Sequence, residues 1–160
     1  MSNVPLNIPE DILKQYAMLL EKQKKIISSD RARADFMSYT KAVWPEFIEG
    51  NHHKVMGEKF NGLATGKIKR LIVNMPPRHT KSEFASFLLP SWLMGLNPKL
   101  KIIQATHTGE LAVRFGRKVR NLMNSADYSQ VFPEVQLRQD SSAAGRWETH
   151  AGVEYFAAGV

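Results

Sequence analysis

A lysine–serine pair at the end of a proline-containing loop is the feature of this sequence with the clearest chemistry. The pair is Lys81 and Ser82, and it closes the run PPRHTKS over residues 76–82. A lysine at the start of a helix can reach the β- and γ-phosphates of a nucleotide, and the hydroxyl that follows it can bind Mg²⁺. The pair therefore predicts a nucleotide-phosphate site.

The loop departs from the general phosphate-loop pattern G-x-x-x-x-G-K-[ST] at both glycines. Met75 and Thr80 stand at those positions, so that only Lys81 and Ser82 match. A β-branched residue is strained where a loop requires a positive φ. Either this loop avoids that geometry at Thr80, or the surroundings enforce it.

The other loop residues add stiffness and positive charge. Pro76 and Pro77 stiffen the start of the loop and carry no N–H. Arg78 and His79 place charge or donors beside the expected phosphates. The alternatives are a solvated basic turn for Arg78 and His79, and a helix cap for Ser82. The predicted phosphate-binding residues are Pro77, Arg78, His79, Thr80, Lys81 and Ser82.

The elements around the loop follow the order of an α/β unit. The pattern predicts a strand over 68–75, a helix over 82–95 that Pro90 kinks, a strand over 100–106, a helix over 108–124, a loop over 125–150 and a strand over 152–158. Strands that alternate with helices indicate a parallel sheet flanked by helices.

The first 65 residues predict helices at 9–27, 30–44 and 51–65, and the second ends before Pro45. Asn7 and Glu10 resemble a capping pair for the first helix, which is expected to pack or dock rather than to carry a site. We divide the chain into an N-terminal helical lead-in over 1–50 and an α/β domain over 51–160.

A long stretch around the loop resembles the large terminase subunits of tailed bacteriophages. The central run is RLIVNMPPRHTKSEFASFLLPSWLMGLNPKLKIIQATHTGELAVRFGRKVRNLMNS. The likeness extends upstream through DFMSYTKAVWPEFIEGNHHKVMGEKF and downstream through VFPEVQLRQDSSAAGRWETHAGVEYFAAGV, so that it covers residues 35–160. The variant phosphate loop of that family commonly reads PPR-x-GKS.

The resemblance implies a P-loop NTPase fold and an ATPase that drives double-stranded viral DNA into an empty capsid. Lys81 matches the phosphate-loop lysine, Ser82 the magnesium-binding hydroxyl, and Arg78 an arginine that senses or stabilises the γ-phosphate. Lys81 and Arg78 are then the catalytic residues, with ATP and Mg²⁺ as cofactors. The implied partners are a small terminase subunit and the portal of the prohead, on which subunits form a ring in the host cytoplasm.

Two parts of the family pattern are not found in this sequence. A glutamine of the adenine-contacting region is replaced by Asn51-His52-His53, and we favour solvated polar side chains at a helix start for both histidines. No apolar strand ending in an acidic pair occurs before Val160. The resemblance therefore implies an incomplete ATPase fold without the C-terminal nuclease, which is expected to hydrolyse ATP poorly alone.

The charge balance favours a polyanionic partner. The chain carries 22 Lys and Arg against 15 Asp and Glu, a formal net charge of +7. Arg114, Arg117 and Lys118 share a helical face with Arg120 beside it, and basic residues at this spacing suit DNA phosphates. An ordinary solvated face, or an arginine that reaches a neighbouring subunit's nucleotide, are the alternatives.

Composition limits the remaining classes of function. The chain has no cysteine, which excludes disulfides and thiolate metal sites, and it has no apolar run near the roughly 20 residues of a membrane span. The rival to a packaging ATPase is a non-catalytic nucleotide- or DNA-binding module with a degenerate phosphate loop. A sequence-specific DNA reader has little support, because no zinc-ligand spacing or recognition-helix pair is present.

Overall fold

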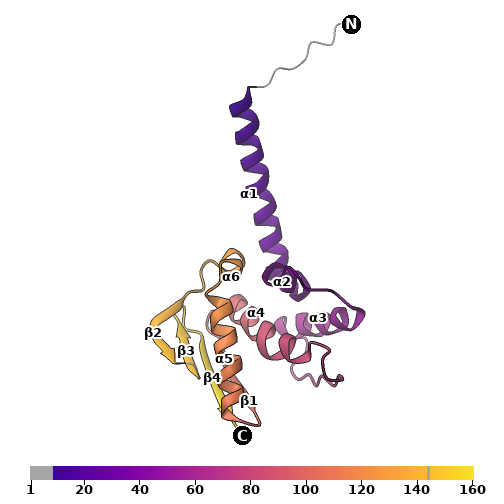
Figure 1. Cartoon of the computed structure of the whole chain (residues 1–160), viewed down its shortest axis with the longest axis vertical. Helices are drawn as coiled ribbons and strands as arrows, with labels where there is room; N and C mark the ends of the chain where they lie inside the picture. The colour runs from indigo at the N-terminus through magenta and orange to yellow at the C-terminus, as the bar shows by residue number, and fades with distance from the viewer. Residues whose placement is uncertain (1–8, 144) are drawn as a thin grey trace.

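The computed structural model describes residues 9–143 and 145–160, as a mixed α/β fold that is 57% helix (Figure 1). Its helices are α1 (Glu10–Ala34), α2 (Phe36–Val43), α3 (Asn51–Ala64), the π-helical segment η1 (Glu83–Leu88), α4 (Leu89–Leu96), α5 (Gly109–Met123) and α6 (Ala126–Val131). Its strands are β1 (Lys101–Thr106), β2 (Leu137–Ala143), β3 (Arg146–Thr149) and β4 (Glu154–Gly159).

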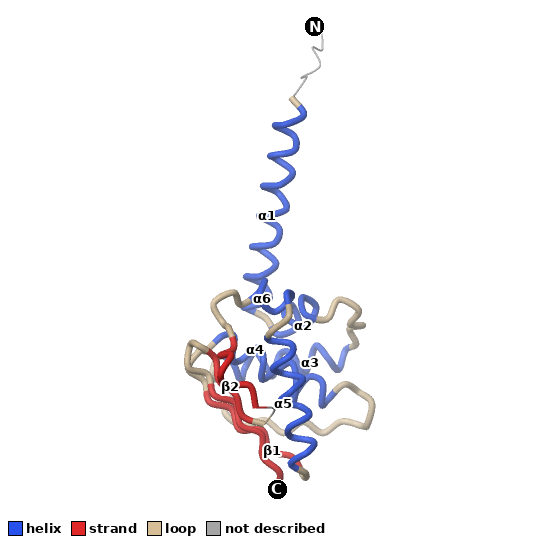
Figure 2. The backbone as a smooth tube through the Cα atoms, turned by 60° about the vertical axis from the view of Figure 1, so that its left-hand side comes forward, coloured by secondary structure: helices blue, strands red, loops and turns tan. Residues whose placement is uncertain are grey.

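The strands form one mixed sheet in the order β1-β4-β3-β2. β1 and β4 are parallel, with Ile102 opposite Tyr155, whereas β3 is antiparallel to both β4 and β2. α5 packs across β1 and β4 (Figure 2). The α/β class is confirmed, and so are the strands predicted at 100–106 and 152–158 and the helix predicted at 108–124.

The prediction of a wholly parallel sheet is wrong, because the region expected to be a loop at 125–150 folds into α6, β2 and β3. α6 is a single short helix, capped by Ser125, whose Oγ accepts the N–H of Tyr128 at 3.2 Å. β2 has the sequence LRQDSSA. So polar a strand lacks the apolar run that marks a buried parallel strand.

The break between the first two helices lies at Asp35, later in the chain than the gap at residues 28–29 that the sequence predicts. Asp35 is extended, with φ −143°, and its carboxylate accepts the backbone N–H of Ser38 at 2.8 Å. This N-cap starts α2, so that the single helix predicted over 30–44 is wrong. The first part of α1 projects away from the rest of the protein (Figure 1), and Asn7 of the predicted capping pair lies outside the described residues.

Residues 70–75 are not part of the sheet, although the sequence predicts a strand over 68–75. The segment keeps the period of a strand: Leu71, Val73 and Met75 are half-buried against the core, while Ile72 is 86% exposed. No strand pairs with it among the described residues. The apolar alternation of this segment is therefore present without the hydrogen-bonded ladder that defines a strand.

An aromatic cluster holds the helices together and anchors the segment that follows the loop. Phe36 of α2 meets Phe60 of α3, Phe84 of η1 and Trp92 of α4 in edge-on contacts with ring centroids 5.0–5.5 Å apart. All four rings are at most 1% exposed. Full burial of such a side chain contributes about 1.5–3 kcal/mol, so that Phe84 fixes the helix three residues after Lys81.

Pro90 is accommodated by a change of helical register rather than by the break that a proline often causes. The segment before it, η1, is π-helical, and the N–H of Leu89 donates to the carbonyl of Phe84, five residues earlier. Pro90 cannot donate to any carbonyl. The π-helical turn places the irregularity directly after the loop, and such turns are frequent at functional sites.

Candidate phosphate-binding site

The loop before Lys81 turns through two residues in the left-handed region. Arg78 has φ 64° and Thr80 has φ 58°, and within residues 9–143 and 145–160 they are the only non-glycine residues with a positive φ. His79 between them and the helical Lys81 after them are not left-handed. When the sign of φ alternates in this way, successive N–H groups turn to one side and form an anion-binding nest.

The helix that follows the loop starts with unsatisfied donors. It begins at Lys81, and its first intrahelical hydrogen bond runs from the N–H of Phe84 to the carbonyl of Thr80, at 2.9 Å. The N–H groups of Lys81, Ser82 and Glu83 therefore have no acceptor within the helix. Among the residues that the structure describes, no side chain accepts a hydrogen bond from the N–H groups of this start. The positive end of the helix dipole is left for an outside acceptor.

Lys81 reaches back across the loop. Its Nζ donates to the carbonyl of Met75 at 3.1 Å, and its side chain is half-buried. Residues 75 and 81 are the two ends of the turn, so that the ammonium group lies over its opening. An ammonium group has three donors, and two remain for a ligand.

The structure brings all six predicted site residues onto one turn. Arg78, His79 and Ser82 are exposed, and His79 donates from Nδ1 to the carbonyl of Pro77 at 2.9 Å. Within the described part of the chain, the Arg78 guanidinium and the Ser82 hydroxyl have no hydrogen-bond or ion-pair partner. Both are therefore available to a phosphate or to a bound cation.

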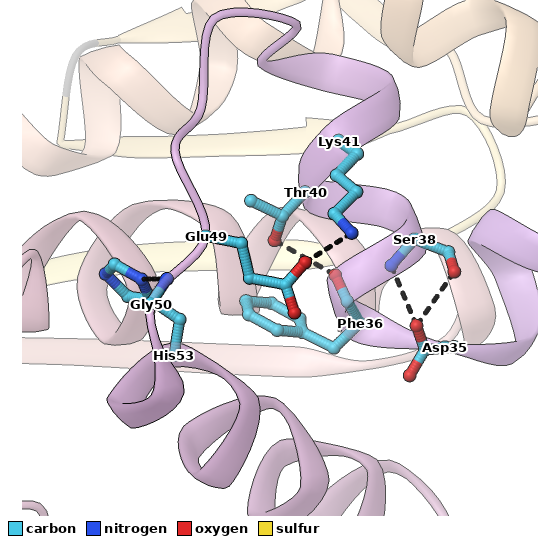
Figure 3. A network of polar contacts seen from close by, with 8 residues as sticks. All are labelled: Asp35, Phe36, Ser38, Thr40, Lys41, Glu49, Gly50 and His53. Carbon is cyan, nitrogen blue, oxygen red and sulfur yellow. Dashed lines mark hydrogen bonds and ion pairs between the residues drawn. The ribbon is translucent and has the colours of Figure 1, made fainter.

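His53 is a residue of this site that the sequence analysis missed. Its Nε2 lies 2.6 Å from the hydroxyl of Thr80, and its Nδ1 accepts the backbone N–H of Gly50 at 2.8 Å (Figure 3). The Thr80 hydroxyl in turn donates to the carbonyl of His79 at 2.6 Å. The start of α3 is thus joined to the centre of the loop, 27 residues later.

The expectation that both histidines are solvated is wrong for His53. It is 5% exposed, whereas His52 is exposed. Burial lowers the pKa of His53, and the neighbouring rings of His52 and His79 lower it further, against the opposing charge of Glu49. Glu49 itself pairs with Lys41 of α2 (Figure 3). One sequence signal could have placed His53 at the site. It stands three residues after Gly50, where a polar side chain can accept the backbone N–H of the N-cap residue.

The residues of the predicted basic face of α5 lie in two different environments. Arg114 and Arg117 are exposed. Lys118 instead pairs with Glu83, the residue after Ser82, at 2.8 Å, and lies 4.8 Å from the centre of the Phe87 ring. It therefore links α5 to η1 and already has a carboxylate partner, in addition to lying on the basic face that the sequence predicts.

The residues around the loop could hold Mg²⁺ through a single protein ligand. No group of three or more His, Cys, Asp or Glu side chains that could hold a metal ion occurs in the described part of the chain. Mg²⁺ is commonly held by one or two protein ligands, with phosphate oxygens and water supplying the rest. The exposed Ser82 hydroxyl suits that arrangement as the protein ligand.

Comparison of the chain with protein-family models, with curated proteins and with solved structures finds no match. Among the helices that the structure describes, none combines the length and apolar character needed to cross a membrane.

Proposed function

We propose that this chain binds the phosphate tail of ATP, with Mg²⁺, at the loop of residues 76–82, as the nucleotide-binding part of a viral DNA-packaging ATPase of the large-terminase type. The observation that carries the proposal is the alternating sign of φ from Arg78 to Lys81, which leads into an uncapped helix start. The resemblance of residues 35–160 to that family supports the reaction class.

The loop amides and three loop side chains have distinct parts in the proposed site. The loop amides hold the β-phosphate, Lys81 leaves the Met75 carbonyl to bridge the β- and γ-phosphates, and Ser82 binds Mg²⁺. Arg78 neutralises charge on the γ-phosphate as water attacks it in line. Charge stabilisation by such groups is the main contribution of a protein to phosphoryl transfer.

A titration with Mg-ATP tests the proposal. Lys81→Ala is expected to weaken binding about 10–100-fold, because a hydrogen bond to a charged group contributes about 1.5–3 kcal/mol. Lys99→Ala is the matched control, since Lys99 is an exposed lysine in the turn before β1 and its loss changes the net charge equally. Equal affinity of the wild type and Lys81→Ala would refute the proposal.

Double-stranded DNA is the proposed second ligand, with Arg114 and Arg117 of α5 as phosphate contacts. Replacing both by alanine is expected to reduce the slope of log K against log salt by about 1.8, because each phosphate contact contributes about 0.9. Lys118→Ala is the comparison variant. In the wild type Lys118 pairs with Glu83 rather than with a phosphate, so that the slope of the variant should equal that of the wild type.

A non-catalytic nucleotide-binding module is the second candidate, and Thr80 at a left-handed position favours it. Strain at that residue makes the loop harder to rearrange between nucleotide states. Measurement of phosphate release distinguishes the two candidates. Because this chain is expected to hydrolyse ATP poorly alone, slow release of phosphate that is lost in Lys81→Ala supports the ATPase, whereas Lys81-dependent binding with release no faster than the uncatalysed rate supports the module.

A further inference from the structure

Thr80 occupies a conformation that its side chain disfavours. Its φ of 58° lies in the left-handed region, where a β-branched residue is a steric outlier. Residues stay in such conformations only when their surroundings hold them there. The loop therefore needs a contact that fixes Thr80, and the structure supplies one from another element.

A directed chain of hydrogen bonds ends on the Thr80 hydroxyl. A backbone N–H can only donate, so that Nδ1 of His53 is the acceptor of the Gly50 N–H at 2.8 Å. The proton of the neutral imidazole is then on Nε2, which donates to Oγ1 of Thr80 at 2.6 Å. Oγ1 passes its own proton toward the carbonyl of His79, at 2.6 Å. Each of the three donors in this series of hydrogen bonds therefore has one acceptor.

The ring of His53 is itself fixed. Phe47 meets it edge-on with ring centroids 4.8 Å apart, and Phe84 lies 5.1 Å away, centroid to centroid. Phe84 is fully buried in the aromatic core. The imidazole is thus held between the core and Gly50 at the start of α3 (Figure 3), and its Nε2 lies 2.6 Å from Oγ1 of Thr80.

We infer that His53 is the positioning residue of the loop, whose Nε2–H holds Thr80 in the left-handed conformation that glycine adopts without help. The consequence for nucleotide binding rests on the function proposed above. Protonation of His53 would place a second proton on Nδ1, directly against the N–H of Gly50. The neutral ring is therefore the form that maintains the loop.

A double-mutant cycle of His53→Ala and Thr80→Gly tests the inference on the whole chain. With Thr80 present, His53→Ala is expected to weaken Mg-ATP binding about tenfold, as release of a left-handed residue predicts. In the Thr80→Gly background the same change should weaken binding less than about twofold, because glycine needs no support at positive φ. Equal weakening in both backgrounds would overturn the inference.

A second variant keeps the inference testable if His53→Ala fails to fold. Thr80→Val keeps the β-branched shape but removes the hydroxyl, and it should weaken Mg-ATP binding to a similar extent while leaving the aromatic core intact. The ¹⁵N shifts of the His53 ring report the tautomer directly. A proton on Nε2 and none on Nδ1 is expected in the wild type, and the opposite tautomer would contradict the inference.

The same cycle measured by urea unfolding separates this inference from the proposed function. Should the wild type and Lys81→Ala bind Mg-ATP equally, the proposed function fails, but the coupling of His53 and Thr80 in the unfolding equilibrium can still be measured. We expect a coupling of about fivefold or more. Additive effects of the two substitutions would overturn the positioning role.

Discussion

Two turns of this protein lead into helices, and their threonines act in opposite ways. Thr108 precedes α5 with φ −138°, and its Oγ1 accepts the N–H of Leu111 at 3.3 Å. Thr80 precedes the helix that begins at Lys81 with φ 58°, and its Oγ1 is occupied by His53 and the carbonyl of His79. One threonine caps its helix, and the other leaves its helix uncapped.

The packing around the two helix starts also differs. At the start of α5 the backbone of β4 lies so close that a Cβ added to Gly159 would come within 2.3 Å of the nitrogen of Gly109. Arg78 and Ser82, which border the other helix start, are exposed. Because Thr108, Gly109 and Glu110 are exposed as well, the feature that separates the two helix starts is the threonine cap, and a helix N-terminus keeps its N–H groups for an anion only where no side chain caps it.

The largest expected effect comes from converting the open turn into a capped one. Thr80→Asp supplies a carboxylate that accepts the free helix N–H groups and repels phosphate. We expect Mg-ATP binding to weaken by about 100-fold or more, which corresponds to about 2.7 kcal/mol. The matched variant Thr108→Asp should leave binding unchanged. Wild-type affinity in Thr80→Asp would show that the helix start does not contact the ligand.

Removal of the existing cap should have the next largest effect, and on a different property. Thr108→Ala is expected to lower the free energy of unfolding by about 1 kcal/mol, the usual contribution of an N-cap. Mg-ATP affinity should not change, because the start of α5 lies outside the loop of residues 76–82 that is proposed to bind phosphate. Urea unfolding and the Mg-ATP titration measure the two properties. Loss of affinity without loss of stability would reverse the roles of the two turns.

Acidification should act on the open turn through His53. Its pKa is lowered in the folded protein by burial and by His52 and His79, with Glu49 opposing. An unfolded histidine titrates at about 6.5. Below that pH the unfolded state binds more protons than the folded state, so that stability falls as the pH is lowered toward the pKa of folded His53.

Urea unfolding at about pH 7.5 and about pH 5.5 measures this pH dependence, with His53→Gln as the comparison. The variant removes the titrating ring, so that its loss of stability on acidification should be smaller than that of the wild type. His107→Gln is the matched control, since His107 is exposed and is not among the groups that shift the pKa of His53. An identical pH dependence in the wild type and His53→Gln would show that folding does not lower the pKa of His53.

The smallest effect is expected at the ion pair beside the loop. Glu83 and Lys118 are each more than a third exposed, at 38% and 41%. Exposed pairs contribute about 0–1 kcal/mol, so that Glu83→Gln should change stability by less than about 1 kcal/mol. High salt should reduce the difference further. A loss of several kcal/mol would mean that η1 depends on α5 more than the exposure of the pair indicates.

The sequence predicts this fold well where its local signals are strong. The helix over Gly109–Met123 has regular apolar spacing and a threonine cap, and the strand over Lys101–Thr106 is a compact apolar run. β2 was missed because its polar sequence becomes a strand only through pairing with β3. The alternation of apolar residues over Ile68–Met75 predicts a strand, and the structure keeps that alternation, although no partner strand lies beside the segment in the described structure.

The sequence predicts the residues of the loop but not the contact from His53 that holds the loop. Residues 77–82 do lie together on one turn, as contiguity in the sequence requires. The contact from His53 joins positions 27 residues apart, and no local pattern predicts such a contact. The sequence places a threonine where the phosphate-loop pattern has a glycine. The contact of Thr80 with His53 of α3, which only the folded structure shows, explains how the threonine is held there.

Backbone amide shifts during a titration with Mg-ATP test the central claim most directly. Signals from residues 79–83 are expected to move and saturate together, because their N–H groups form the proposed phosphate nest. Signals from residues 109–111, at the capped start of α5, should stay in place. Shifts at residues 109–111 with none at residues 79–83 would contradict the account.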